Sequence, residues 1–578
     1  MTDNQNLPEN MPQEKRPVEP ENPPPQWTPP PPLQWAPPSA VPYTPYVPPR
    51  PSVRPVTPLE KRDGLFFLLL IPAVFLFMDF AFFSGFALGF TLSFDLLFLL
   101  ATLYLAGKGR PTPFSIACGL LSLAAAVIPA LYRDPLLGGL MILLAAGCFS
   151  LHLCGMCGGL RERDGAAMLL AWLSGTLAAP FRYLTEPFRS VGAVMKNSSR
   201  KRLGQAFLGL VLAVPVLCVV VPLLIRSDAA YESMMGSAMD NVGGWLLRLV
   251  LTVLFAPLFI SWLFAYRKEL RKDPPPQEGE RSRLLSVPVC TAFLALLSAF
   301  YLSYLFSQLA YFFSAFAGML PQGYTLTSAE YARRGFFELA AIAGINIGLL
   351  LLVEWLTERT GTGRLPLPVR GLSLFICLFT LLLTATAFSK MALYIRLFGM
   401  TRLRVLTSLF MGMLAAALVF LLLRLFLPRF PLVRAAAVVC GFLLTTAAFI
   451  DVDRFISRYN VEAYRSGALS TVDTAHLGQL SVSAVPSLIE LLDDEDPKVA
   501  LGAGQALCDQ LRHMEAKGLL SAAQNAVRDR RDGGFARYNA AEDKACRLLI
   551  AEYGRYKDAN QRPEDLTPPS WENRDNGR

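Results

Sequence analysis

Long runs of apolar residues dominate the chain between residues 65 and 450. The hydrocarbon core of a bilayer is about 30 Å thick, so a helix needs about 20 apolar residues to cross it. By that rule the sequence predicts eleven spans, at residues 65–83, 86–106, 114–132, 136–155, 205–225, 245–266, 286–313, 336–356, 370–388, 403–427 and 432–450. The predicted fold class is therefore all-α, a polytopic transmembrane helical bundle.

One apolar run, Ala166 to Pro180, is shorter than a span requires. It leads into a segment where basic residues sit among aromatic ones, which favours an interfacial or re-entrant segment. A full span here would turn the basic segment 267–283 outward, whereas basic connections prefer the cytoplasmic side. Eleven spans in a cell membrane therefore predict a cytoplasmic N-terminus and an extracellular C-terminal tail around the transmembrane domain, residues 61–451.

The two flanks differ from the apolar region. Residues 1–60 are polar and proline-rich, which predicts a disordered tail that is either a spacer or a ligand for polyproline-binding modules. Residues 452–560 predict a soluble helical region, and Ala484 to Leu507 resembles a single HEAT repeat. One repeat does not bury its own apolar face, so it must pack on its helical neighbours, the membrane domain or a partner. Residues 561–578 are predicted to be disordered.

Composition agrees with a membrane protein and limits the chemistry. Hydrophobic residues make up 53% of the chain and charged residues 17%, where soluble proteins carry about a quarter charged residues. The ten cysteines are scattered, mostly through apolar runs, and suit packing better than a disulfide framework. No cofactor or nucleic-acid partner is expected. The motifs of nucleotide hydrolysis, zinc proteolysis and serine hydrolysis are absent from the sequence, so an enzymatic role has little support.

Two segments resemble the signature of an uncharacterised family of bacterial polytopic membrane proteins, domain of unknown function 4173, a relative of domain 4153. The first segment is AEYARRGFFEL, Ala329 to Leu339, and the second is YIRLFGMTRLR, Tyr394 to Arg404. The matching positions of the first segment are Glu330, Tyr331, Arg333, Gly335 and Phe336, preceded by Gln308 and Tyr311. The resemblance covers about residues 285 to 495 and implies a fold without implying a chemistry.

Both segments are predicted on the outer side, where their arginines run against the preference of basic residues for the cytoplasm. Arginine forks match phosphate or carboxylate, so the pattern predicts a site for an anionic group. The predicted binding residues are Tyr331, Arg333, Tyr394, Arg402 and Arg404. A structural salt bridge between these arginines and Glu330 or Glu338 is the alternative.

Charged residues within the spans are the other candidates, because ions are costly in hydrocarbon and tend to mark functional sites. Asp95 is the deepest acid and is included as a predicted binding residue that faces other helices. Charges nearer the span ends, such as Arg248 and Arg424, are expected to reach the interface. Asn346 is expected to form a hydrogen bond between helices, in a packing face with Gly344 and Gly348.

Two further patterns have weak support. Cys148, His152, Cys154 and Cys157 lie at one end of a span, but a CxxC usually holds a metal together with a second CxxC, which the sequence lacks. Asp451 and Asp453 form a DxD after the last span, the pattern that a metal-dependent sugar transferase uses, although a helix exit at the interface is the simpler interpretation.

Three functional hypotheses result. The first is transport or handling of an anionic envelope solute or lipid headgroup at an outward-facing site. The second is an assembly or sensing scaffold that recruits protein partners through its two tails. A membrane-embedded transferase ranks last.

Overall fold

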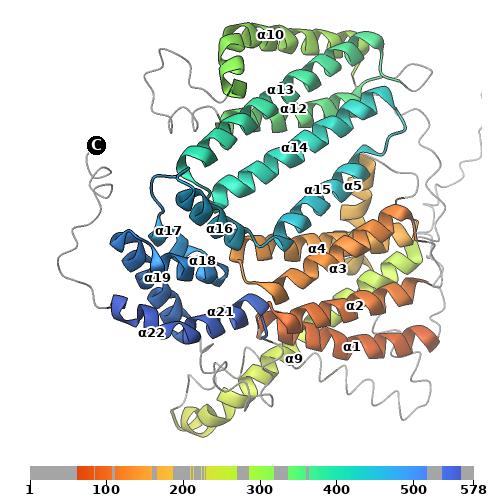
Figure 1. Ribbon diagram of the computed structural model, residues 1–578. Helices are drawn as coiled ribbons and strands as arrows, with labels where there is room; N and C mark the ends of the chain where they lie inside the picture. The colour runs from red at the N-terminus through yellow and green to blue at the C-terminus, as the bar shows by residue number, and fades with distance from the viewer. Residues whose placement is uncertain are drawn as a thin grey trace, which may run out of the picture. The chain divides into compact units, whose positions relative to one another are not determined.

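The computed structural model describes residues 61–83, 85–106, 111–158, 160, 166–185, 229–269, 285–317, 336–358, 364–516 and 537–560, with single positions between 209 and 227 (Figure 1). Several predictions lie outside these residues. They are the proline-rich tail, the central part of the span at 205–225, the segment 329–335 and the end at 561–578.

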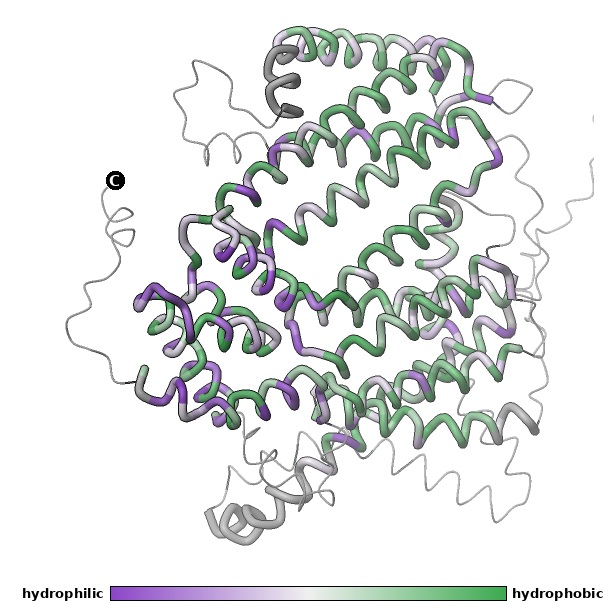
Figure 2. Tube along the Cα trace, in the orientation of Figure 1, coloured by the Kyte–Doolittle hydropathy of each residue, from purple (hydrophilic) through white to green (hydrophobic). Residues whose placement is uncertain are grey.

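Within the described residues the secondary structure is helical, apart from one β-bridge between Leu285 and Thr357. Nine described helices are long and apolar enough to cross a membrane, which confirms the predicted all-α membrane fold. They are or lie within α2 Leu88–Ala106, α3 Pro113–Leu131, α4 Pro135–Met156, α9 Ala229–Glu269, α10 Val287–Ala317, α12 Phe336–Leu356, α13 Leu367–Phe398, α14 Arg402–Phe426 and α15 Leu432–Phe449. Helix α1, Lys61–Phe82, carries a shorter apolar stretch, Phe66–Phe82. Figure 2 shows apolar residues along all of these helices.

Two helices are longer than the sequence predicts. Helix α13 continues to Phe398 instead of ending at residue 388, and its 32 residues measure about 48 Å at 1.5 Å per residue. The prediction stopped at the polar residues Ser389 and Lys390, but a helix continues through such residues until a breaker, here Gly399. Helix α9 begins at Ala229, whereas the predicted span begins at residue 245. The prediction missed the first turns because they are polar.

The segment that was predicted to be interfacial is helical. It consists of α5 Ala166–Leu173, a π-helical turn Ser174–Ala178 and α6 Ala179–Arg182. Trp172 Nε1 donates to Ser150 Oγ of α4 at 3.0 Å, and the hydroxyls of Thr176 and Ser150 are 2.5 Å apart. These bonds fix the segment to α4.

Small and polar residues bring the spanning helices together. A side chain at Gly119 of α3 would lie 2.8 Å from His152 Nδ1 of α4, so the two helices approach closely there. The predicted interhelical hydrogen bond of Asn346 is confirmed: Tyr301 Oη donates to its Oδ1 at 2.6 Å, and its Nδ2 donates to Thr380 Oγ1 at 2.9 Å. The neighbouring Gly344 and Gly348 face open space and do not build the expected packing face.

Charges near the span ends find partners in the protein. Arg248 Nε of α9 lies 2.5 Å from Asp79 Oδ1 of α1, and Arg424 Nε of α14 lies 2.7 Å from Glu354 Oε1 of α12. These contacts spare the ions the cost of standing unpaired in hydrocarbon.

The C-terminal region, referred to below as the tail domain, is a cluster of short helices. Its helices are α16 Val452–Arg465, α17 Thr474–Gln479, α18 Val485–Glu490, α19 Pro497–Ala516, α21 Ala540–Ala551 and α22 Tyr553–Tyr556. Helices α18 and α19 flank an acidic turn, as the sequence predicts, and α19 packs against α17, α18, α21 and α22. Identification of this pair as a HEAT repeat stays a prediction.

The topology can be tested with single cysteines at Pro30 and at Ser470, an exposed position of the tail domain. An odd number of spans puts these positions on opposite sides, so an impermeant thiol reagent is expected to label Ser470→Cys in intact cells and Pro30→Cys only after lysis. The parent chain, with its own cysteines, is the control. Labelling of Pro30→Cys in intact cells would contradict the predicted orientation.

Candidate functional site

The tail domain docks on one end of the bundle, where several helices begin or end. The end of α3, the start of α4, the turn between α13 and α14, and the end of α15 lie there. Contacts from α16 and α21 hold the tail domain at this junction. The second predicted signature segment, Tyr394 to Arg404, contains the α13–α14 turn and lies at the centre of this junction.

The backbone of this turn requires glycine and is clamped by an asparagine. Gly399 has φ 74° and ψ −175°, a conformation that is essentially restricted to glycine. A side chain there would also lie 2.8 Å from Asn460 Oδ1 of α16. Asn460 accepts a hydrogen bond from Met400 N at 2.7 Å and donates one to Met400 O at 2.9 Å. The Asn460 side chain thus satisfies the backbone N–H and C=O of Met400, as a neighbouring backbone segment would.

Arg404 caps the end of α13. Its Nη1 donates to the carbonyl oxygens of Phe398 at 2.9 Å and Gly399 at 2.5 Å, and its guanidinium lies 4.0 Å from the ring centroid of Tyr394. A cation is favourable at a helix C-terminus, where carbonyl groups lack helical partners. The sequence predicts that Tyr394 and Arg404 bind an anion. The structure brings them together, but with Arg404 as the cap of α13 and the Tyr394 ring packed against its guanidinium.

Arg402 joins the membrane helices to the tail domain. Its Nε donates to Asp453 Oδ1 at 2.5 Å and its Nη2 donates to Asp453 Oδ2, a bidentate pair. Asp134, the N-cap of α4, lies 3.8 Å from Arg402 Nε. The Asp453 side chain is only 1% exposed and also accepts from Ser481 N at 2.8 Å. Burial acts to raise the pKa of Asp453, but the bonds from Arg402 and Ser481 outweigh it and hold the pKa below its ordinary value.

These contacts bear on the predicted anion site. Arg402 and Arg404 are bonded within the protein, and among the described residues the partner of Arg402 is Asp453 and not Glu338. Tyr331, Arg333 and Glu330 lie outside the described residues. An anion site on the five signature residues therefore stays a prediction.

A second attachment, which the sequence did not indicate, involves α21. Asn539 Nδ2 donates to Pro129 O at the end of α3 at 3.0 Å, and Leu88 N donates to Tyr538 O at 3.2 Å. Arg133 and Glu542 form an ion pair at 3.5 Å. A single Asn and an ordinary ion pair carry no sequence signal for such an attachment.

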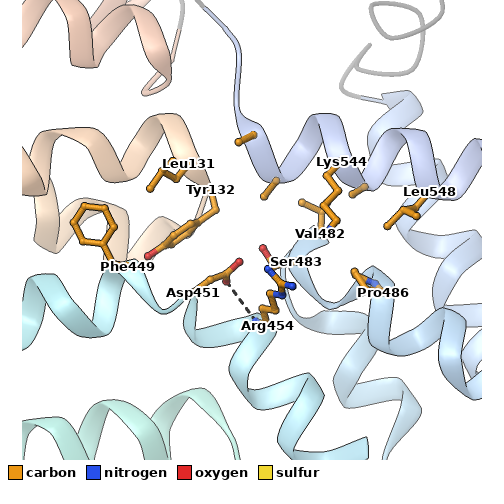
Figure 3. Close-up of a pocket in the computed structure, with 13 residues that line it drawn as sticks. Leu131, Tyr132, Phe449, Asp451, Arg454, Val482, Ser483, Pro486, Lys544 and Leu548 are labelled. Atoms are coloured by element: carbon orange, nitrogen blue, oxygen red, sulfur yellow. Dashed lines mark hydrogen bonds between the residues drawn. The ribbon is translucent and has the colours of Figure 1, made fainter.

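Between the two attachments lies a cavity of about 240 Å³ (Figure 3). Its apolar walls come from the ends of α3 and α15 and from α18 and α21. Its polar lining groups are Tyr132, Asp451, Arg454, Ser483 and Lys544. Tyr132 and Ser483 are 6% and 7% exposed, and neither hydroxyl has a hydrogen-bond partner of good geometry. Buried polar groups are normally paired, so both hydroxyls have capacity for a ligand.

Asp451 occupies the centre of this polar lining. It has φ 58°, a left-handed conformation that is uncommon outside glycine, and it caps α16 through one hydrogen bond from Arg454 N at 3.4 Å. Burial raises the pKa of its carboxyl, and the opposing effect of the nearby Ser483 hydroxyl is smaller. The two residues of the DxD therefore differ: Asp453 is bound by Arg402, whereas Asp451 has acceptor capacity left.

The remaining candidates lie elsewhere. Asp95 is half-buried in α2, and its buried Oδ1 has no hydrogen-bond partner among the described residues. His152 is bonded to Ser115 O at 2.8 Å and stacks on Phe98. The structure does not bring Asp95 to the junction, because it lies seven residues beyond Leu88, where α2 starts at that end.

The fold and the junction define a multi-pass integral membrane protein with a helical domain docked on one end of its spans. The chain belongs to the family described as domain of unknown function (DUF4153), whose model matches residues 116–491. This is the relative of the family named from the signature segments, and the match begins well before residue 285, so the family region includes α3, α4 and the junction. No curated protein and no solved structure matches the chain.

Substitution of Gly399 tests the constraint on the turn. Alanine there must adopt a glycine-only conformation, at about 1–3 kcal/mol, and must also displace Asn460. Gly467 has the same φ of 74° but open space around it, so Gly467→Ala is the matched control. We expect the apparent Tm of the purified protein to fall more for Gly399→Ala. Equal decreases would show that the clamp contributes nothing.

Substitution of Asp453 tests the docking of the tail domain. Removing one partner of a buried pair costs about 3–5 kcal/mol, and since Arg402 is 34% exposed we expect about 2 kcal/mol for Asp453→Asn. The expected readout is faster proteolysis of the tail domain and a lower Tm. Glu462→Gln, which breaks an exposed pair with Arg458, is the control and should change little. Unchanged proteolysis of Asp453→Asn would exclude a docking role for the pair.

Proposed function

We propose that this protein binds the phosphate group of a small solute or of a lipid headgroup in the junction cavity, on the predicted outer side of the cell membrane. The proposal keeps the predicted handling of an anionic envelope molecule but assigns it to the cavity and not to the signature arginines. The same site would serve transport of the bound molecule.

The observation that supports it most is the set of free polar groups in the cavity. The buried hydroxyls of Tyr132 and Ser483 have no hydrogen-bond partner of good geometry among the described residues, and the cations Arg454 and Lys544 line the same space. Arginine and lysine side chains are the groups that most often bind phosphate in proteins, and the hydroxyls leave further polar capacity in the same cavity. Arg454 and Lys544 are exposed, so they border the open side of the cavity, where a ligand enters.

The signature arginines are less suited to the role. An anion at Arg402 would have to displace the Asp453 carboxylate, which is buried and has a lowered pKa. Leaving that carboxylate unpaired would cost several kcal/mol. Arg404 is held by two carbonyl groups and by the Tyr394 ring.

Sensing is the second candidate, because the tail domain supplies part of the cavity wall. Val482, Ser483 and Pro486 lie just before or in α18, and Lys544 lies in α21, whereas Tyr132 follows α3. A ligand that contacts both sides stabilises the docked arrangement, since binding to one state shifts the population toward it. Partners of the tail domain would then respond to ligand occupancy.

The test is binding of inorganic phosphate and glycerol phosphate to the purified full-length protein, measured by calorimetry. Arg454→Gln with Lys544→Gln is expected to weaken binding by about tenfold or more, because charge-assisted contacts contribute about 1.5–3 kcal/mol when they are partly desolvated. Arg458→Gln is the matched control, since Arg458 lies on α16 and does not line the cavity.

Two results would overturn the proposal. One is the absence of binding for every phosphate probe by the folded protein. The other is binding that is insensitive to the Arg454 and Lys544 substitutions but is lost in Arg402→Gln or Arg404→Gln variants that remain folded, which would return the site to the signature segment.

A further inference from the structure

Resting on the proposed function, the geometry points to a zwitterionic ligand: we infer that the cavity recognises a phosphate that carries a primary ammonium group, as in a phosphoethanolamine headgroup. Asp451 would bind the ammonium at the inner end, and Arg454 and Lys544 would bind the phosphate at the opening.

The inner end offers oxygen atoms that can accept hydrogen bonds. Figure 3 shows the Asp451 carboxylate between the hydroxyls of Tyr132 and Ser483. A carboxylate accepts about four hydrogen bonds, and that of Asp451 has the long contact from Arg454 N and the nearby Ser483 hydroxyl, so acceptor capacity is left. A primary ammonium has three N–H donors and no acceptor, which complements one carboxylate and two hydroxyl oxygens. An added anion at this end would instead meet the charge of Asp451.

The opening carries the opposite charge. Arg454 and Lys544 are exposed, whereas Tyr132 and Ser483 are buried, so the lining is anionic inside and cationic outside. A ligand with an ammonium group at one end and a phosphate at the other matches this order. The cavity also suits a small ligand. Its volume of about 240 Å³ is below the 300–1,000 Å³ of sites that hold drug-sized ligands, and a headgroup is smaller than those.

The position of the cavity favours a headgroup that is attached to a lipid. Leu131 and Phe449, the last residues of the spanning helices α3 and α15, form part of the wall. Phe449, Ile450 and Phe455 are exposed apolar residues that flank Asp451 along the chain. Acyl chains that leave the phosphate would therefore run along the ends of two spanning helices.

The decisive comparison is between O-phosphoethanolamine and phosphocholine, measured by calorimetry on the purified full-length protein. The two share the phosphate, but the trimethylammonium of phosphocholine has no N–H to donate. We expect phosphoethanolamine to bind about tenfold or more tightly than phosphocholine or inorganic phosphate, because Asp451 makes a charge-assisted hydrogen bond only with the first.

Asp451→Asn separates recognition from folding. Asparagine tolerates the left-handed conformation and is a good N-cap, so the start of α16 is retained. The variant is expected to lose the preference for phosphoethanolamine while it still binds inorganic phosphate. Asp473→Asn, at the N-cap of α17 and not a cavity residue, is the control.

The results distinguish ammonium recognition from the phosphate binding on which it rests. Binding of phosphate with equal affinity for all three probes, or a preference that survives Asp451→Asn, overturns ammonium recognition and leaves the proposed function standing. No binding of any probe overturns both. Nanodiscs of phosphatidylethanolamine and of phosphatidylcholine identify the source: retention of the first lipid alone indicates a headgroup, and binding of soluble phosphoethanolamine alone indicates a free solute.

Discussion

The junction depends on the neutralisation of a buried carboxylate. Asp453 is almost completely enclosed, and an ion in such a place must be paired and hydrogen-bonded to be tolerated. Arg402 pairs with it although a cation at the start of a helix opposes the helix dipole. The N-termini of α4, α14 and α16 converge here, and Asp134 and Asp453 supply the negative charge that three such ends favour.

From this pair follows the position of the tail domain. Asp451 is the N-cap of α16, so the contact of Asp453 with Arg402 also fixes this left-handed residue two positions earlier. Asn460, two turns further along α16, clamps Met400, and α21 closes the other side through Asn539 and Pro129. The cavity exists only because these attachments hold two groups of helices around it.

The sequence predicts the apolar helices of the described residues well and the junction poorly. Length and hydropathy decide whether a helix crosses a membrane, so the predicted range for α12 agrees with the structure, whereas the far end of α13 was missed. The charge of Arg402 and Arg404 marked them as candidates, but the sequence did not indicate their partners. Asp453 is distant from Arg402 in the sequence, and the backbone carbonyl groups that bind Arg404 are present at every residue. Tyr132 and Ser483 are ordinary residues until the fold buries them without partners.

The distinction between satisfied and unsatisfied polar groups separates structure from function at this junction. In the second signature segment, Gly399, Arg402 and Arg404 each have a defined partner or backbone role, so together they encode a joint. Removing any of them would affect docking whether or not a ligand exists. The hydroxyls that line the cavity have no such role in the part of the chain that the structure describes, and burying a hydroxyl without a well-placed partner costs about 1–3 kcal/mol. A bound ligand recovers that cost, which is why the cavity, rather than the signature segment, is the place to look for one.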